Sequence, residues 1–185
     1  MTKPTILTLD ALGDAPVGGK AEGLAKLVGL GLRVPQAFVV VGATPGQLPE
    51  DLEARYAELG GEAVAVRSSA LGEDSADASF AGQYETTLDV TGIEALRAAI
   101  DACLASLESS RADVYRQQSA GDDVEHAMSV VVQNMAPAAS AGVLFTADPV
   151  TGRRDRIVID AVEGLGEALD LSLKVEMDPS LGSQF

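Results

Sequence analysis

Two basic residues occur in sequence contexts that favour anion binding. Lys20 follows two glycines at the expected start of a helix, where backbone N–H groups and the positive end of the helix dipole attract anions. Arg67 ends the apolar segment Val64–Val66, and a guanidinium entering from a buried strand needs a compensating anion, because an unpaired buried charge is costly. We therefore expect Lys20 and Arg67 to lie close together around one anion. The alternative is that each pairs with one of the 28 aspartate and glutamate side chains.

The two glycines before Lys20 invite comparison with the phosphate-binding P-loop. That pattern requires glycine at position 14 and serine or threonine at position 21, but the chain has Asp14 and Ala21. The hydroxyl that would hold magnesium is therefore missing. These two departures from the P-loop pattern exclude a Walker A site.

Residues 68–86 are mainly serine, alanine, glycine and acidic residues, with little apolar content. Such a segment can bring backbone N–H groups close to phosphates and can close over them as a lid. The alternative is an ordinary surface loop. In either case few side chains can anchor it to a core, so we expect residues 70–80 to be the most mobile internal segment.

Composition excludes several other kinds of function. The formal net charge of -15 disfavours nucleic-acid binding, which requires a basic surface. The single cysteine, Cys103, excludes a disulfide framework, and with His126 as the single histidine no typical zinc ligand set exists. The sequence shows no signal peptide and no apolar run long enough to span a bilayer. We expect a cytoplasmic protein that binds neither nucleic acid nor membrane.

The elements that must position these side chains follow from hydrophobic periodicity. Apolar residues at helical spacing predict a helix from Lys20 towards Leu32, and β-branched runs bounded by turn residues predict strands. The full prediction comprises helices over 20–32, 48–59 and 93–107, the last extending to about 119, and strands over 37–41, 64–66, 128–132, 142–146 and 156–160. Helices and strands do not alternate strictly, so the pattern predicts an α+β fold rather than a doubly wound sheet.

Several segments resemble, in order, the motifs of the phosphoenolpyruvate synthase and pyruvate phosphate dikinase family. They match that family's GGKGANLA-type opening, its VAVRSSA…ED…ASFAGQ signature, its VVVQKM strand, its GVMFTxDP segment and its GLGE turn. The matching residues are Gly18–Ala25, Val64–Ala70 with Glu73, Asp74 and Ala78–Gln83, Val131–Met135, Gly142–Pro149 and Gly164–Glu167. The same domain occurs in rifampicin phosphotransferases and glucan, water dikinases, so the resemblance identifies the domain but not the acceptor.

The resemblance implies an ATP-grasp fold, in which ATP lies between two lobes, and a Mg²⁺ requirement. It implies that Lys20 and Arg67 contact phosphates as catalytic and binding cations. It further places Gly82 and Thr86 on the phosphate-side loop, Gln133 at a nucleotide contact, and Met135 and Ala136 close to the base. Glu163 and Glu167 are weaker candidates for assisting residues, since both also suit ordinary turn or helix-start positions.

The chain also departs from the family pattern. The family's acidic metal-binding motif and Gln-x-Arg strand are not found, so the metal ligands stay unassigned. His126 matches no motif and is interpreted as a surface residue. We therefore interpret residues 1–185 as a single truncated ATP-grasp domain, with a first lobe over about 1–127 and a hinge strand and start of the remaining lobe over about 128–185.

The implied function is the ATP-binding N-terminal part of a dikinase or phosphotransferase. In the family, the β-phosphate of ATP passes to a histidine on another domain and then to pyruvate or another acceptor. The expected partners are thus ATP, Mg²⁺ and the missing domains, on the same or a separate chain, and exposed core-like surface favours self-association. By itself this chain is expected to bind ATP weakly and transfer no phosphate. The alternatives are a non-catalytic nucleotide-binding or interaction module and a purely structural fragment.

Overall fold

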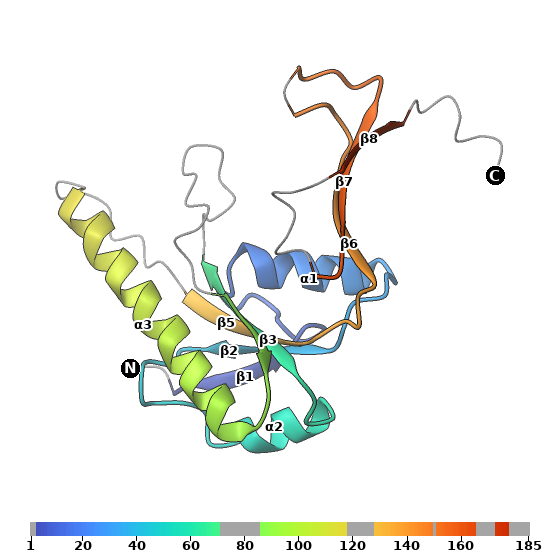
Figure 1. Ribbon diagram of the computed structural model, residues 1–185. Coiled ribbons are helices and arrows are strands. Elements are labelled where there is room, and N and C mark those ends of the chain that lie inside the picture. Colours follow the sequence, from blue (N-terminus) through green and yellow to red (C-terminus); the bar gives the residue numbers. More distant parts are fainter. Residues whose placement is uncertain (1–2, 71–85, 118–127, 150, 166–172, 178–185) are drawn as a thin grey trace. The chain divides into compact units, whose positions relative to one another are not determined.

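The computed structural model describes residues 3–70, 86–117, 128–149, 151–165 and 173–177 (Figure 1). The chain divides into two compact units, Met1–Met135 and Ala136–Phe185. Each unit contains one antiparallel sheet. Mixed helices and antiparallel strands confirm the predicted α+β class, whereas the ATP-grasp assignment stays a prediction.

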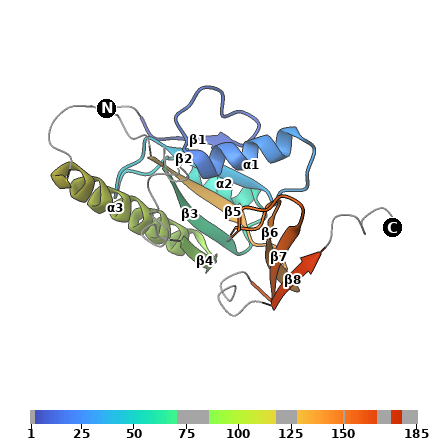
Figure 2. The same cartoon turned by 90° about the horizontal axis from the view of Figure 1, so that it is seen from above.

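The first unit is a five-stranded sheet with helices on both faces. Its strand order is β1-β2-β5-β3-β4. Helix α1 packs on one face, while α2 and α3 pack on the other. In Figure 1 α1 lies above the strands and α2 below them, and Figure 2 gives the view from above. In chain order the elements are β1 (Thr5–Thr8), α1 (Gly19–Gly29), β2 (Ala37–Val41), α2 (Leu52–Glu58), β3 (Val64–Ala70), β4 (Thr86–Val90), α3 (Ile93–Gln117) and β5 (Met128–Asn134).

Strand β5 is the centre of this sheet, hydrogen-bonded to β2 on one side and β3 on the other. Because both its edges and both its faces are covered, three consecutive valines are fully buried there, namely Val130, Val131 and Val132. The interpretation of residues from about 128 onwards as the hinge strand and start of the remaining lobe stays a prediction. In the structure β5 is part of the first compact unit, which ends at Met135.

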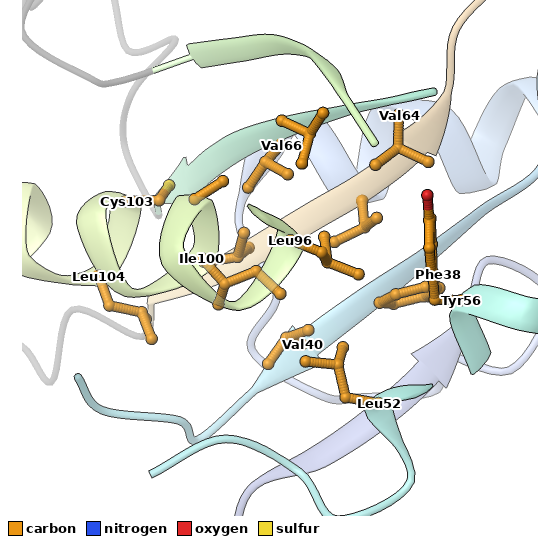
Figure 3. Close-up of a cluster of buried hydrophobic side chains, with 14 residues drawn as sticks. Phe38, Val40, Leu52, Tyr56, Val64, Val66, Leu96, Ile100, Cys103 and Leu104 are labelled. Carbon is orange, nitrogen blue, oxygen red and sulfur yellow. The ribbon is translucent and has the colours of Figure 1, made fainter. Parts of the chain in front are cut away.

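The face of the sheet under α2 and α3 carries the larger core (Figure 3). Side chains alternate across each strand, so Val64 and Val66 of β3 face these helices together with Val130 and Val132 of β5. From the helices come Leu52 and Tyr56 of α2 and Leu96, Ile100, Cys103 and Leu104 of α3. The apolar spacing that predicts the third helix is thus the stripe by which α3 packs on the sheet.

Tyr56 joins three backbone segments at the edge of this core. Its hydroxyl lies 3.1 Å and 2.9 Å from the carbonyl oxygens of Gly61 and Glu62, and it accepts the N–H of Gly92 at 2.9 Å. The ring itself is buried, at 6% exposure. One side chain of α2 therefore fixes the approach to β3 and the turn before α3.

We expect Tyr56→Phe to lower the free energy of unfolding by about 1–3 kcal/mol, because it leaves partly buried backbone groups unsatisfied while keeping the ring. Urea denaturation measures the change, and hydrogen exchange at the Gly92 amide should accelerate. An unchanged urea midpoint would show that water replaces the hydroxyl without cost.

Helix α1 is shorter than its apolar pattern predicts. It ends at Gly29, because Gly31 adopts a φ of 74° and the N–H groups of Gly31 and Leu32 bond back to the carbonyls of Val28 and Leu27. This is the glycine-dependent helix termination that satisfies the last carbonyls. As a result Leu30 and Leu32 are exposed rather than packed on the helix face.

Three of the strands that the structure describes are absent from the sequence prediction, and another is longer than predicted. The missed strands are β1, β4 and β8 (Leu173–Met177). Strand β3 continues past Arg67 to Ala70, because Ser68 and Ser69 pair with Val130 and Ser129 of β5. Residues 68–70 are therefore not part of a loop, and residues 71–85 of the predicted lid lie outside the described residues.

The second unit is a three-stranded sheet, β6 (Ser140–Phe145), β7 (Ile157–Glu163) and β8, in that order. The turn between β6 and β7 is held by Asp148, whose backbone exchanges hydrogen bonds with Arg153 and Gly152 and whose carboxylate accepts the N–H of Thr151. Arg153 also binds Asp155 and thereby lowers the pKa of that carboxyl. Within the part of the chain that the structure describes, no helix is both long and apolar enough to cross a membrane.

Candidate functional site

Three of the predicted site residues share one face of the first sheet. Arg67 lies opposite Thr86 of β4 and opposite Val131 of β5 in the strand register. Residues directly opposite in antiparallel strands project to the same face, and Val131 packs in the core beneath α1. Gln133, two residues further along β5, is on that same face. The α1 face therefore carries Arg67, Thr86 and Gln133.

Arg67 is half-buried in this face. Its Nε is fully buried and has no hydrogen-bond partner within the described part of the chain. A buried donor left without a partner costs about 1–3 kcal/mol, so natural folds seldom retain one without a reason. No carboxylate among the described residues bonds to this Nε, and anion binding by Arg67 stays a prediction.

The start of α1 is fixed directly against the strand that carries Arg67. Gly18 precedes the helix with a φ of 80°, and a Cβ at this position would lie 2.6 Å from the carbonyl carbon and oxygen of Ser69. The N–H of Ala21 donates to the Oγ of Ser69 at 3.1 Å. Only glycine allows so close an approach. The helix start is thus locked to β3 two residues from Arg67.

Lys20 stands in that locked first turn, next to Ala21. Its backbone segment and that of Arg67 are therefore neighbours, although 48 positions separate the residues joined by the Ala21–Ser69 bond. The helix also packs on the face to which Arg67 projects. A common anion site for the two side chains stays a prediction, and this arrangement supports it.

Gln133 has a structural contact of its own. It is 9% exposed, and its Nε2 donates to the carbonyl oxygen of Pro35 at 3.2 Å. The neighbouring N–H groups of Asn134 and Met135 bond to the carbonyls of Gln36 and Ala63. The end of β5 is thereby held to the segments that precede β2 and β3.

The remaining candidates fall at or beyond the limits of the described structure. Met135 is half-buried at the end of the first unit and Ala136 is exposed at the start of the second. Glu163 is exposed at the end of β7. Gly82, His126 and Glu167 lie outside the described residues, so their predicted roles stay predictions.

The described residues do not form a metal centre of their own. Among them, no group of three histidine, cysteine, aspartate or glutamate side chains is arranged to hold a metal ion. Since Mg²⁺ is commonly bound by one or two carboxylates together with substrate phosphates, this finding excludes only a metal centre built from three or more of these side chains. The chemistry that Arg67 and the start of α1 can supply is charge neutralisation and hydrogen bonding to an anion.

Two open hollows in the first unit lie away from Arg67. One, of about 460 Å³, lies at the end of α1 between Val28, Pro35 and Arg55. The hydrogen bond and charge of Glu58, together with Asp51, raise the pKa of Arg55 above its usual value. The other, of about 450 Å³, is lined by residues 12–17 and the middle of α1. Neither hollow includes Lys20 or Arg67 in its lining.

Sequence reasoning missed the two serines that fix the helix start. Ser69 and Ser129 are fully buried, and the Oγ of Ser129 donates to the carbonyl oxygen of Val17 at 2.5 Å. The available signal was a serine close to the run of apolar residues in each of these two strands, where a buried hydroxyl needs a partner.

Comparison with known proteins gives a family match across most of the chain. The family model described as "Pyruvate phosphate dikinase, AMP/ATP-binding domain" matches residues 40–170. Arg67, Thr86 and Gln133 lie inside the matched region, and Lys20 precedes it. This match confirms the resemblance drawn from the sequence motifs.

Individual relatives agree with this match. The chain is 41% identical to a rifampicin phosphotransferase of Bacillus subtilis, over 88% of this chain and 19% of the relative. It is 40% identical to the prodigiosin synthesizing transferase PigC of Serratia marcescens, over 83% of this chain and 20% of the relative. It is 45% identical to a phosphoenolpyruvate synthase of Pyrococcus furiosus, over 68% of this chain and 16% of the relative. The chain thus spans about a fifth of the length of these relatives.

Proposed function

The chain belongs to the family of the pyruvate phosphate dikinase AMP/ATP-binding domain, and on that premise we propose that its first unit binds the phosphates of ATP between Arg67 and the start of α1. The observation that carries the proposal is the buried Nε of Arg67, which has no partner within the described residues. A phosphate bound at the half-buried guanidinium would neutralise its charge. The adjacent helix start adds the positive end of a dipole and the Lys20 ammonium.

The other predicted residues surround the phosphate site between Arg67 and the start of α1. Thr86 faces Arg67 from β4 and, with Gly82, belongs to the phosphate side of the site. Gln133 stands on the same face of β5 and contacts the nucleotide, with Met135 and Ala136 near the base. Such a site works by positioning and charge neutralisation, which is what phosphoryl transfer chiefly requires of a protein. We accordingly assign residues 1–185 to a truncated ATP-grasp-like domain.

We propose that the bound ATP serves phosphoryl transfer through a histidine on another domain, with pyruvate or another molecule as final acceptor. The names of the relatives, rifampicin phosphotransferase and phosphoenolpyruvate synthase, support a phosphotransferase and leave the acceptor open. Because the described residues offer no carboxylate cluster for a metal, Mg²⁺ enters the proposal only as an ion bound by the phosphates of ATP. No step is assigned to a protein-held metal.

We expect the 185-residue chain to bind ATP in isothermal titration calorimetry but to release no phosphate and form no phosphoprotein. The reason is that its described residues provide cations for binding but no group of three metal ligands to fix the geometry of an in-line transfer. Incubation with β- and γ-labelled ATP and Mg²⁺ measures both reactions. Turnover that disappears in Arg67→Ala would show that the chain is a complete catalyst. Failure to bind ATP at all would leave only a structural role.

A further inference from the structure

Helix α1 is capped by a residue from a distant strand rather than by its own N-cap. The N-cap residue is Gly18, which has no side chain to accept a hydrogen bond. In helices, an N-cap serine normally accepts the N–H of the second or third helical residue. Here Ala21, the third residue of the helix, donates to the Oγ of Ser69 from β3 instead. Ser69 thus performs the capping function across the tertiary structure.

A second serine holds the residue on the other side of Gly18. Ser129 lies opposite Ser69 in the register of β3 and β5, is fully buried, and donates its hydroxyl to the carbonyl of Val17. The chain is therefore pinned to the sheet both before and after Gly18. This double attachment leaves the first turn of α1 little freedom to slide along the sheet.

We infer that Ser69 is a positioning residue of the proposed phosphate site, which holds the first turn of α1 and its Lys20 at a fixed place relative to Arg67. The inference rests on the proposed function. Ser69 and Arg67 alternate along β3 and project to the same face. A hydrogen bond from Ser69 to the helix therefore ties the two cation-bearing segments together, and preorganised charges bind an anion better than charges that must first be brought together.

Ser68→Ala provides a matched control for Ser69→Ala. Ser68 is the next residue of the same strand and is equally buried, at 1% against 0% exposure. It projects to the opposite face, and its Oγ has no hydrogen-bond partner among the described residues. We expect Ser69→Ala to weaken ATP binding about tenfold, because it removes the buried hydrogen bond from the Ala21 N–H that holds the helix start, and one such bond corresponds to about a factor of ten. Ser68→Ala should leave ATP affinity within about twofold, because its hydroxyl positions nothing.

A double-mutant cycle separates positioning from mere stability. ATP affinity is measured by calorimetry, below the unfolding temperature of each variant, for Lys20→Ala, Ser69→Ala and the double variant. If Ser69 positions Lys20, removing Lys20 should cost much less affinity in the Ser69→Ala background than in the wild-type chain. Ser129→Ala removes the hydrogen bond to Val17 instead and should likewise reduce the contribution of Lys20 to ATP affinity. This variant replaces Ser69→Ala in the cycle if Ser69→Ala does not fold.

The outcomes distinguish the two proposals. Non-additive losses support the positioning role. If the chain binds ATP and the affinity losses caused by Lys20→Ala and Ser69→Ala are strictly additive, this inference is overturned and the proposed function still stands. Absence of ATP binding by the wild-type chain would overturn both.

Discussion

Arg67→Ala is expected to weaken ATP binding by roughly 10–100-fold without lowering the stability of the fold. Hydrogen bonds to a charged group contribute about 1.5–3 kcal/mol each, and a guanidinium meets phosphate with a planar set of donors. The stability expectation follows from the structure, since the Nε of Arg67 is buried and has no partner within the described residues. Removing a donor that the fold does not use should leave the urea midpoint unchanged or raise it.

Arg67→Lys and Arg97→Ala sharpen this experiment. Lysine keeps the charge but not the planar donor geometry, so it should recover only part of the affinity. Arg97 lies on α3, which packs on the opposite face of the sheet, so Arg97→Ala should bind ATP as the wild-type chain does. A large loss of stability in Arg67→Ala, with ATP affinity retained, would indicate a structural rather than a ligand-binding arginine.

Gly18→Ala is expected to lower the free energy of unfolding by about 2–6 kcal/mol, the largest stability effect predicted for this chain. An alanine held at a φ of 80° costs about 1–3 kcal/mol. Its Cβ would also lie 2.6 Å from backbone atoms of Ser69, and relieving such overpacking typically costs a further 1–3 kcal/mol or so. Since those atoms belong to β3, a strand paired on both sides, the helix start must move instead.

Gly13→Ala is the matched control, measured by urea denaturation beside Gly18→Ala. Gly13 also has a positive φ, of 54°, but a Cβ there would meet no atom within 4 Å. It should therefore cost only the backbone contribution, about 1–2 kcal/mol. Equal losses in the two variants would mean that the contact between Gly18 and Ser69 adds nothing to stability.

Elements with a strong local side-chain pattern can be predicted from the amino-acid sequence. The run of β-branched and aromatic residues at 37–41 forms a strand as predicted, and the helical spacing from residue 93 forms a helix. The motifs are equally informative, because their residue types and order are sufficient to indicate the family that the comparison confirms. Arg67 can be singled out because a charge next to an apolar strand is an anomaly that the sequence itself displays.

Which elements meet depends on tertiary contacts that no local pattern contains. The residues of β4 show no clear alternation of apolar and polar side chains, and Asp89 within it has a φ of 56°. This strand forms because the edge of β3 is available for pairing. The length of β3 and the central place of β5 likewise depend on partners far away in the chain. The cap on α1 is the sharpest case. Local rules ask the N-cap residue to accept the helix N–H, but Gly18 cannot, and the acceptor is supplied by Ser69 only when the sheet has formed.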